Sequence, residues 1–129
     1  MLNSVYIIDD DPISILVTET MMRKNDFVRN IMTFEEPKQA LDHFESQYQW
    51  ESGVPDYIFL DVQMPEINAW QFLERYAKIN PSISGTAHII LLSATFNPDD
   101  ESRARSHPMV IELITKPVNG TILDRLRLK

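Results

Sequence analysis

The chain has 129 residues, of which 43% are hydrophobic and 24% are charged, with a net charge of −7 and no cysteine. This length suits one globular domain that buries its core without a structural metal, and the absence of cysteine excludes disulfide frameworks, thiolate metal sites and cysteine nucleophiles. The negative charge argues against nucleic-acid binding, which requires a basic face. Because no apolar run approaches the roughly 20 residues that span a bilayer and no signal peptide is recognisable, we expect a cytoplasmic protein without a membrane partner.

Short apolar runs alternate with helical spacing along the chain. Five runs predict strands, in chain order Val5–Ile8, Val28–Phe34, Tyr57–Leu60, Ile89–Leu92 and Val110–Ile114. The second is more polar than the others, which is typical of a strand at a sheet edge. A helical pattern follows each strand, and Pro12, Pro37 and Pro98 stand at helix starts, where a missing N–H costs no hydrogen bond. Asn97 is placed to cap the fourth helix.

Apolar spacing also predicts the buried face of each helix. The expected buried stripes are Ile13, Leu16, Val17 and Met21; Leu41, Phe44 and Tyr48; Ala69, Phe72, Leu73 and Tyr76; and Val118, Ile122, Leu123 and Leu126. The segment Pro98 to His107 has no large apolar residue, so we expect the fourth helix to pack loosely and to be the most mobile element. A long surface connection is expected over Gln49–Asp56.

Repeated alternation of strand and helix predicts an α/β fold with a parallel sheet and helices on both faces. No linker or repeat divides the chain, so we interpret residues 1–129 as one doubly wound domain. The carboxyl ends of parallel strands meet at one edge of such a sheet, and ligands bind there. Side chains that follow the predicted strands are therefore the candidates for a functional site.

Three adjacent carboxylates, Asp9 to Asp11, follow the first strand. Carboxylates this close repel one another unless a cation neutralises them or their pKa values rise. Oxygen ligands without histidine or cysteine favour Mg²⁺, or Mn²⁺, over Zn²⁺. The alternative is an exposed acidic loop that begins a helix, where aspartate stabilises the helix dipole. Asp61, directly after the third strand, favours the metal-site interpretation, because it is too far from the next helix to cap it.

Ser93 ends the fourth strand and Lys116 follows the fifth. Each is weak evidence alone, since a lysine after a strand is commonly solvated. Together with the acids they place carboxylates, a hydroxyl and an ammonium at four strand ends, a combination that chance rarely produces. This set suits a divalent cation and a phosphoryl group on Asp61.

These motifs resemble the receiver domain of bacterial two-component response regulators along essentially the whole chain. The matching segments are Ile7-Ile8-Asp9-Asp10-Asp11, Leu60-Asp61-Val62-Gln63-Met64-Pro65, Leu92-Ser93-Ala94 and Thr115-Lys116-Pro117. The resemblance implies a flavodoxin-like, five-stranded sheet of order 2-1-3-4-5. It also implies that Asp61 is the phosphoacceptor and that Ser93 and Lys116 contact the phosphoryl group. The implied Mg²⁺ ligands are Asp10, Asp61 and the backbone carbonyl of Gln63, with Asp9 as a further ligand through a water molecule.

The sequence departs from the family pattern at two positions. Leu113 stands where receivers usually have an aromatic residue that turns inward on activation, so the usual coupling of that ring to Ser93 is in doubt. Ala69, preceded by Asn68, stands where a glycine commonly follows the Met-Pro motif. We therefore expect any response to phosphorylation to pass mainly through the fourth helix.

The chain ends soon after the predicted fifth helix, so we expect a stand-alone receiver that is phosphorylated by a sensor histidine kinase or a phosphotransfer protein and signals to a separate protein. Two alternatives remain. A pseudo-receiver would use the fold for protein contacts without phosphate, which Leu113 favours. A phosphatase acting through an aspartyl phosphate would need a second carboxylate two residues after Asp61, where Gln63 cannot serve as a general acid.

Overall fold

The computed structural model describes residues 1–46, 55–79 and 88–128. In chain order these residues form β1 (Leu2–Ile8), α1 (Pro12–Lys24), β2 (Val28–Phe34), α2 (Pro37–Ser46), β3 (Tyr57–Asp61), α3 (Ala69–Ile79), β4 (His88–Ser93), α5 (Pro98–Ser106), β5 (Val110–Thr115) and α6 (Gly120–Arg127). Most of the predicted connection Gln49–Asp56, and Tyr48 of the second helical stripe, lie outside the described residues. None of the helices in the described ranges is long and apolar enough to cross a membrane.

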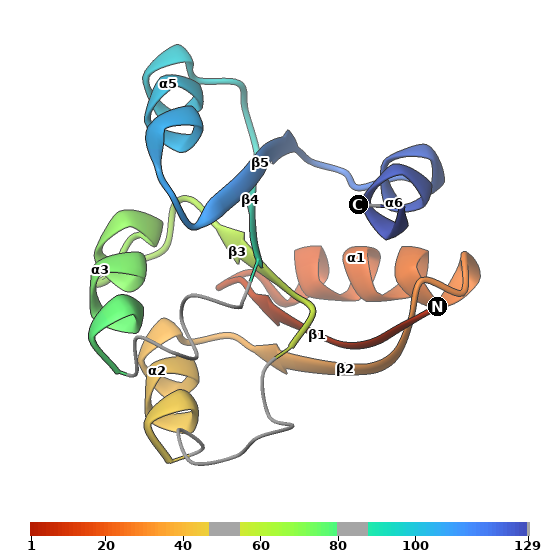
Figure 1. Ribbon diagram of the computed structural model, residues 1–129, viewed down its shortest axis with the longest axis horizontal. Helices are drawn as coiled ribbons and strands as arrows, with labels where there is room; N and C mark the ends of the chain where they lie inside the picture. Colours follow the sequence, from red (N-terminus) through yellow and green to blue (C-terminus); the bar gives the residue numbers. More distant parts are fainter. Residues whose placement is uncertain (47–54, 80–87, 129) are drawn as a thin grey trace.

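The five strands form one parallel sheet of order β2-β1-β3-β4-β5, which confirms the predicted topology. Strand β2 is at an edge, as its polar residues predict. Helices α1 and α6 cover one face of the sheet, and α2, α3 and α5 cover the other (Figure 1). All carboxyl ends of the strands point the same way, so the residues that follow them meet at one edge of the sheet.

Two apolar cores lie on the two faces of the sheet. On the side of α2, α3 and α5, Ile58 and Leu60 of β3 pack with Phe44 and Tyr76. On the side of α1 and α6, the alternate residue Phe59 packs with other buried side chains such as Met22. Because successive strand residues point to opposite faces, a continuous apolar run is needed to fill both cores. This is why the central strands read as unbroken hydrophobic segments.

Capping side chains and prolines set the starts of several helices. Asp11 and Asn97 accept hydrogen bonds from backbone N–H groups at the starts of α1 and α5, and a proline follows each. Before α3, the Asn68 side chain accepts from the backbone N–H of Gln71, whose own side chain accepts from the backbone N–H of Asn68, both at 2.9 Å. This reciprocal pair is a capping box. It fixes the start of α3 close to the end of β3.

The prediction for the buried face of α1 was wrong at three of its four residues, and only the fourth, Met21, packs half-buried against the core. Ile13 and Leu16 are 71% and 62% exposed, and Val17 is also exposed. The inward face of α1 is formed by other residues, including Ile15 and Met22. Both faces of this helix carry apolar residues at helical spacing, so periodicity alone could not decide which face meets the sheet. An exposed apolar stripe on α1 is the result.

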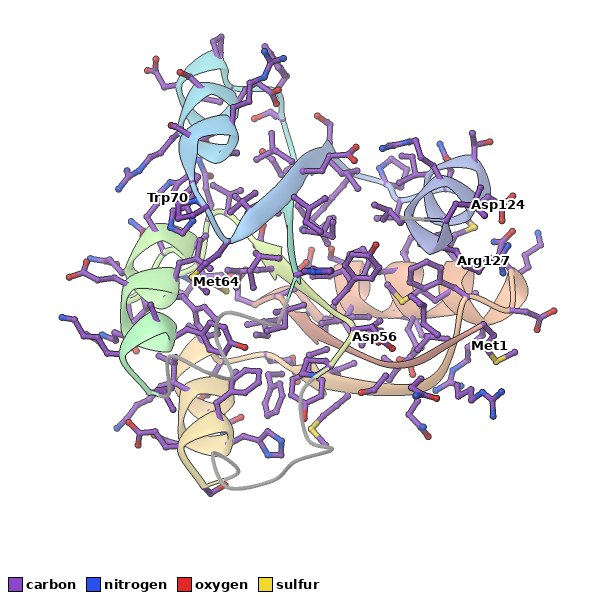
Figure 2. All side chains as sticks on the ribbon, in the orientation of Figure 1. Met1, Asp56, Met64, Trp70, Asp124 and Arg127 are labelled. Carbon is purple, nitrogen blue, oxygen red and sulfur yellow. The ribbon has the colours of Figure 1, made fainter. Side chains whose placement is uncertain are left out.

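Helix α5, the predicted fourth helix, has few buried contacts. Its buried residue is Ala104, while the other side chains of the helix are partly or fully exposed. The guanidinium of Arg103 lies over the ring of Trp70, 4.6 Å from the ring centroid, and the ring of His107 lies 6.4 Å from Trp70. The side chain of Trp70 thus extends from α3 towards α5 (Figure 2). Surface contacts of this kind contribute about 0.5–1 kcal/mol, so we still expect α5 to be held less firmly than the other helices.

Candidate functional site

The site is built from four strand ends. Asp9 and Asp10 follow β1, Asp61 is the last residue of β3, Ser93 is the last residue of β4, and Lys116 follows β5. In the register of the sheet, Asp61 lies opposite Leu92 of β4, and Ser93 lies opposite Thr115 of β5. Neighbouring strands therefore end within a residue of each other, which brings side chains from distant parts of the chain together.

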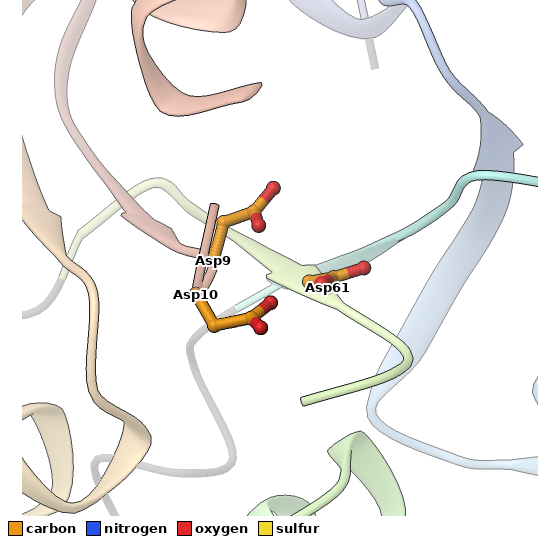
Figure 3. Close-up of side chains that lie close together, drawn as sticks. All are labelled: Asp9, Asp10 and Asp61. Carbon is orange, nitrogen blue, oxygen red and sulfur yellow. The ribbon is translucent and has the colours of Figure 1, made fainter. Parts of the chain in front are cut away.

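The carboxylates of Asp9, Asp10 and Asp61 form a compact cluster. One oxygen of each lies within 4.8 Å of the others. Figure 3 shows Asp9 and Asp10 leaving the end of β1 beside Asp61 at the end of β3, with the three carboxylates directed to the same side. Asp9 is fully buried and Asp61 is almost fully buried, whereas Asp10 is exposed. The cluster thus opens to solvent on the side of Asp10.

Asp9 is held by hydrogen bonds on both of its carboxylate oxygens. Its Oδ1 accepts from the backbone N–H of Asp11 at 3.0 Å. Its Oδ2 accepts from the hydroxyl of Ser14 at 2.6 Å and from the ammonium of Lys116 at 2.8 Å. These donors allow a carboxylate to keep its charge away from water. Asp11 itself is the N-cap of α1, as the acidic-loop interpretation of this motif predicts.

Lys116 lies between two carboxylates. Its ammonium is 2.8 Å from Asp9 Oδ2 and 3.5 Å from Asp61 Oδ1. Burial alone would lower the pKa of Lys116, but the hydrogen bond to Asp9 and the charges of Asp61 and Asp9 outweigh it and raise the pKa above its ordinary value. Lys116 is therefore a permanent positive charge at neutral pH. The peptide bond between Lys116 and Pro117 is cis.

The electrostatics of the cluster act most strongly on Asp61. Burial, followed by the negative charge of Asp9, raises the pKa of Asp61 from 3.8 to about 7, although Lys116 opposes this rise. Three acids with a single ammonium leave the pocket with excess negative charge. A pKa this far from the ordinary value, caused by burial and a neighbouring charge within a pocket, is typical of functional carboxylates.

Ser93 faces the same pocket, and its hydroxyl donates a hydrogen bond to the backbone carbonyl of Thr95 at 2.5 Å. A hydroxyl has one hydrogen to donate. To donate to a ligand in the pocket, the Ser93 hydroxyl must therefore break its hydrogen bond to Thr95. This would free the start of the loop that leads to α5. Leu113 is half-buried on β5 and packs against the core beneath α5.

The pocket above the cluster has a volume of about 200 Å³. Among its lining residues are Asp10, Asp61, Gln63, Ser93 and Lys116. Its donor set of carboxylate oxygens, with no histidine or cysteine in the lining, fits a hard divalent cation such as Mg²⁺. The raised pKa of Asp61 supports this fit, because a bound cation would offset both causes of the rise, the burial of Asp61 and the negative charge of Asp9.

Every residue that the sequence placed in the site lies at this pocket or directly behind it. Sequence reasoning missed Ser14, which reaches back to Asp9 from the first turn of α1, and the carbonyl of Thr95, which holds the hydroxyl of Ser93. A serine five residues after an acid carries no recognisable motif, and a backbone carbonyl carries no sequence signal. Only the folded geometry could identify these two contacts.

The comparisons with known proteins agree with this fold. The family model for the response regulator receiver domain matches residues 5–126, so the chain belongs to the response regulator receiver domain family. Receiver domains are signalling switches that work with histidine kinases or phosphotransfer proteins. A search of curated protein sequences found no match.

Solved structures of the same class are similar over nearly the whole chain. A two-component response regulator from Cytophaga hutchinsonii is 26% identical with a TM-score of 0.90, covering 97% of this chain and 93% of that one. A response regulator receiver protein from Dyadobacter fermentans DSM 18053 is 28% identical with a TM-score of 0.85, covering 96% of this chain and 94% of that one. A CheY-like receiver domain protein from Methanospirillum hungatei JF-1, at 22% identity and a TM-score of 0.72, covers 98% of this chain and 92% of that one, and shares the fold.

Proposed function

We propose that this protein is a phosphoacceptor switch of a two-component phosphorelay, which receives a phosphoryl group on Asp61 and then signals by contact with another protein. The observation that carries the proposal is the position of Asp61, a buried carboxylate whose Oδ1 lies 3.5 Å from the ammonium of Lys116 and whose neighbours are two further acids. A nucleophile, a fixed cation and the ligands for a second cation thus share one small pocket.

The chemistry follows from these groups. An Asp61 oxygen attacks the phosphorus of a phosphorylated histidine on the donor protein, the P–N bond breaks, and an acyl phosphate forms with the imidazole as leaving group. Lys116 and Ser93 contact the equatorial oxygens, which carry most of the charge in the transition state. Mg²⁺, or Mn²⁺, bound by Asp9, Asp10, Asp61 and the backbone carbonyl of Gln63, would neutralise the remaining phosphoryl charge. Water later hydrolyses the acyl phosphate and resets the switch.

We further propose that residues 1–129 are one receiver domain, which acts on itself and on no outside substrate, in the cytoplasm. The net charge of −7 supports protein partners rather than nucleic acid. The exposed stripe of Ile13, Leu16 and Val17 on α1 directly follows Asp10 and Asp11 at the pocket. Its position supports α1 as the surface on which the histidine kinase or phosphotransfer protein docks.

The second candidate function is a phosphate-independent pseudo-receiver, which the replacement of the usual aromatic by Leu113 favours. Against it stands the complete set of Asp61, Ser93 and Lys116 around one pocket. A chain that signalled only by its surface would have no physical need to keep three acids close together, because their repulsion destabilises the fold.

Intact mass spectrometry with acetyl phosphate tests the proposal directly. With MgCl₂ present, the parent should gain the mass of one phosphoryl group, and the gain should disappear in EDTA. Asp61→Asn should gain nothing. Asp42→Asn, which changes an exposed acid on α2, is the matched control and should be phosphorylated like the parent. A parent that stays unmodified in MgCl₂ would favour the pseudo-receiver.

A further inference from the structure

Ser14 has no role in the chemistry derived above, yet its hydroxyl contacts a buried acid of the site. We propose that Ser14 is a positioning residue, which acts through Asp9 to hold that carboxylate ready for a divalent cation. The inference deepens the proposed function and rests on it, because it assumes that Asp9 takes part in binding Mg²⁺.

The first argument is the geometry of the contact. The Ser14 hydroxyl donates to Asp9 Oδ2 at 2.6 Å, a distance typical of a hydroxyl that donates to a charged carboxylate. Asp9 has no contact with solvent, so protein donors must satisfy its charge. The backbone N–H of Asp11 serves Oδ1, which leaves Oδ2 to Ser14 and Lys116.

The second argument is that Lys116 cannot be a dedicated partner of Asp9. Its ammonium also lies 3.5 Å from Asp61, and the proposed reaction requires it at a phosphoryl oxygen. Ser14 has no such competing task among the contacts of the described residues. When Lys116 turns towards the phosphoryl group, the Ser14 hydroxyl still holds Oδ2. Hence Ser14 keeps the orientation of Asp9 constant through the cycle, which Lys116 cannot do.

The third argument is the rigidity of the support. Ser14 lies in the first turn of α1, where Asp11 caps the helix and Pro12 fixes its first residue. Its neighbour Ile15 is buried against the sheet. The position of the Ser14 hydroxyl is thus fixed by the capped helix start before it and by the buried Ile15 after it. Groups that orient metal ligands from behind typically change metal affinity by 10–100-fold when they are removed.

The test is a titration with MgCl₂ followed by the backbone amide signals of Asp10 and Gln63 in ¹⁵N NMR spectra, which measures metal binding without phosphorylation. Ser14→Ala should bind Mg²⁺ about tenfold more weakly than the parent. Ser14→Thr, which restores the hydroxyl, should recover most of the affinity. Thr20→Ala removes an exposed hydroxyl from the same helix and should leave the affinity unchanged.

Melting temperatures in EDTA separate positioning from folding. A purely structural role for Ser14 would lower the melting temperature of Ser14→Ala without changing its Mg²⁺ affinity, and that result would overturn the inference. The inference would also fail if Ser14→Thr bound as weakly as Ser14→Ala, since side-chain volume rather than the hydroxyl would then matter. If the parent itself fails to bind Mg²⁺, the proposed function is contradicted. If the parent binds Mg²⁺ and Ser14→Ala binds it equally well, only the inference about Ser14 is contradicted.

Discussion

The ammonium of Lys116 and the carboxylate of Asp9, 107 positions apart in the chain, form a hydrogen bond of 2.8 Å at the carboxyl edge of the sheet. The same ammonium is farther, 3.5 Å, from the proposed phosphoacceptor Asp61. In this structure Lys116 therefore interacts mainly with Asp9. We expect it to shift towards Asp61 when a phosphoryl group adds negative charge there.

Removal of Lys116 should show how strongly the buried charge of Asp9 destabilises the fold when it has no ionic partner. We predict that Lys116→Met lowers the free energy of unfolding by about 3 kcal/mol at neutral pH in EDTA, because a buried charge loses its ionic partner. Urea unfolding measures the change. The control is Lys78→Met, which breaks the pair of Lys78 with Glu74 at 3.8 Å, where both side chains are largely exposed. Such a pair contributes no more than about 1 kcal/mol. Equal losses in the two variants would contradict the prediction.

The raised pKa of Asp61 predicts how stability depends on pH without a metal. The pKa is about 7 in the folded protein and 3.8 ordinarily, so between these values the folded chain holds more protons than the unfolded chain. Stability in EDTA should therefore fall as the pH rises from about 4 to about 7, by up to a few kcal/mol. Melting temperatures across this range measure the fall.

Two comparisons assign that pH dependence to Asp61. Asp61→Asn should flatten the fall and should be more stable than the parent at pH 7.5, whereas Asp42→Asn on the surface should follow the parent. Addition of MgCl₂ should stabilise the parent more at pH 7.5 than at pH 5, because the cation binds the ionised carboxylate. A parent whose stability in EDTA is constant from pH 4 to pH 7 would contradict the assigned pKa.

The exposed apolar stripe of α1 should matter for a protein donor and not for a small one. We predict that the double variant Ile13→Ser, Leu16→Ser accepts phosphate from acetyl phosphate at the parental rate. Its phosphorylation by the histidine kinase or phosphotransfer protein that serves the parent should be at least about tenfold slower. Burial of a Leu or Ile side chain in an interface contributes about 1.5–3 kcal/mol, and about 1.4 kcal/mol corresponds to a tenfold change in affinity. Met32→Ser changes an exposed apolar residue on β2 and is the control.

Helix α5 is the element that we expect to respond to phosphorylation. Its contacts are few, and the loop before it is tied to the site by the hydrogen bond from Ser93 to Thr95. Hydrogen exchange with and without beryllofluoride, which imitates the phosphoryl group, should show a change of protection in α5 and little change in α2. Equal protection of α5 in both states would contradict this prediction.

Arg103→Ala tests how α5 is held in the resting state. Loss of the contact between Arg103 and Trp70 should speed exchange in α5 without beryllofluoride. Arg105→Ala breaks a surface pair of the same helix with Glu101 and is the matched control.

Much of the fold could be predicted from the sequence because its signals are local. Unbroken apolar runs such as Tyr57–Leu60 are typical of strands covered on both faces, and Pro12 and Pro98 mark helix starts through their missing N–H. The sequence also predicted which polar side chains stand at strand ends, namely those of Asp9, Asp61, Ser93 and Lys116. Parallel strands end at one edge, so this order along the chain was enough to predict that the four side chains gather there.

Other features depend on contacts between distant residues and were decided by the tertiary structure. The exposure of Ile13 and Leu16 depends on which face of α1 meets the sheet, and the residues of α1 allowed either choice. The hydrogen bonds of Asp9 with Ser14 and Lys116 depend on where helix α1 and strand β5 are packed. The chain by itself thus determined which side chains at the strand ends reach the site, through local periodicity. Packing decided which of them touch, because burial and Coulomb interactions depend on distances in space rather than along the chain.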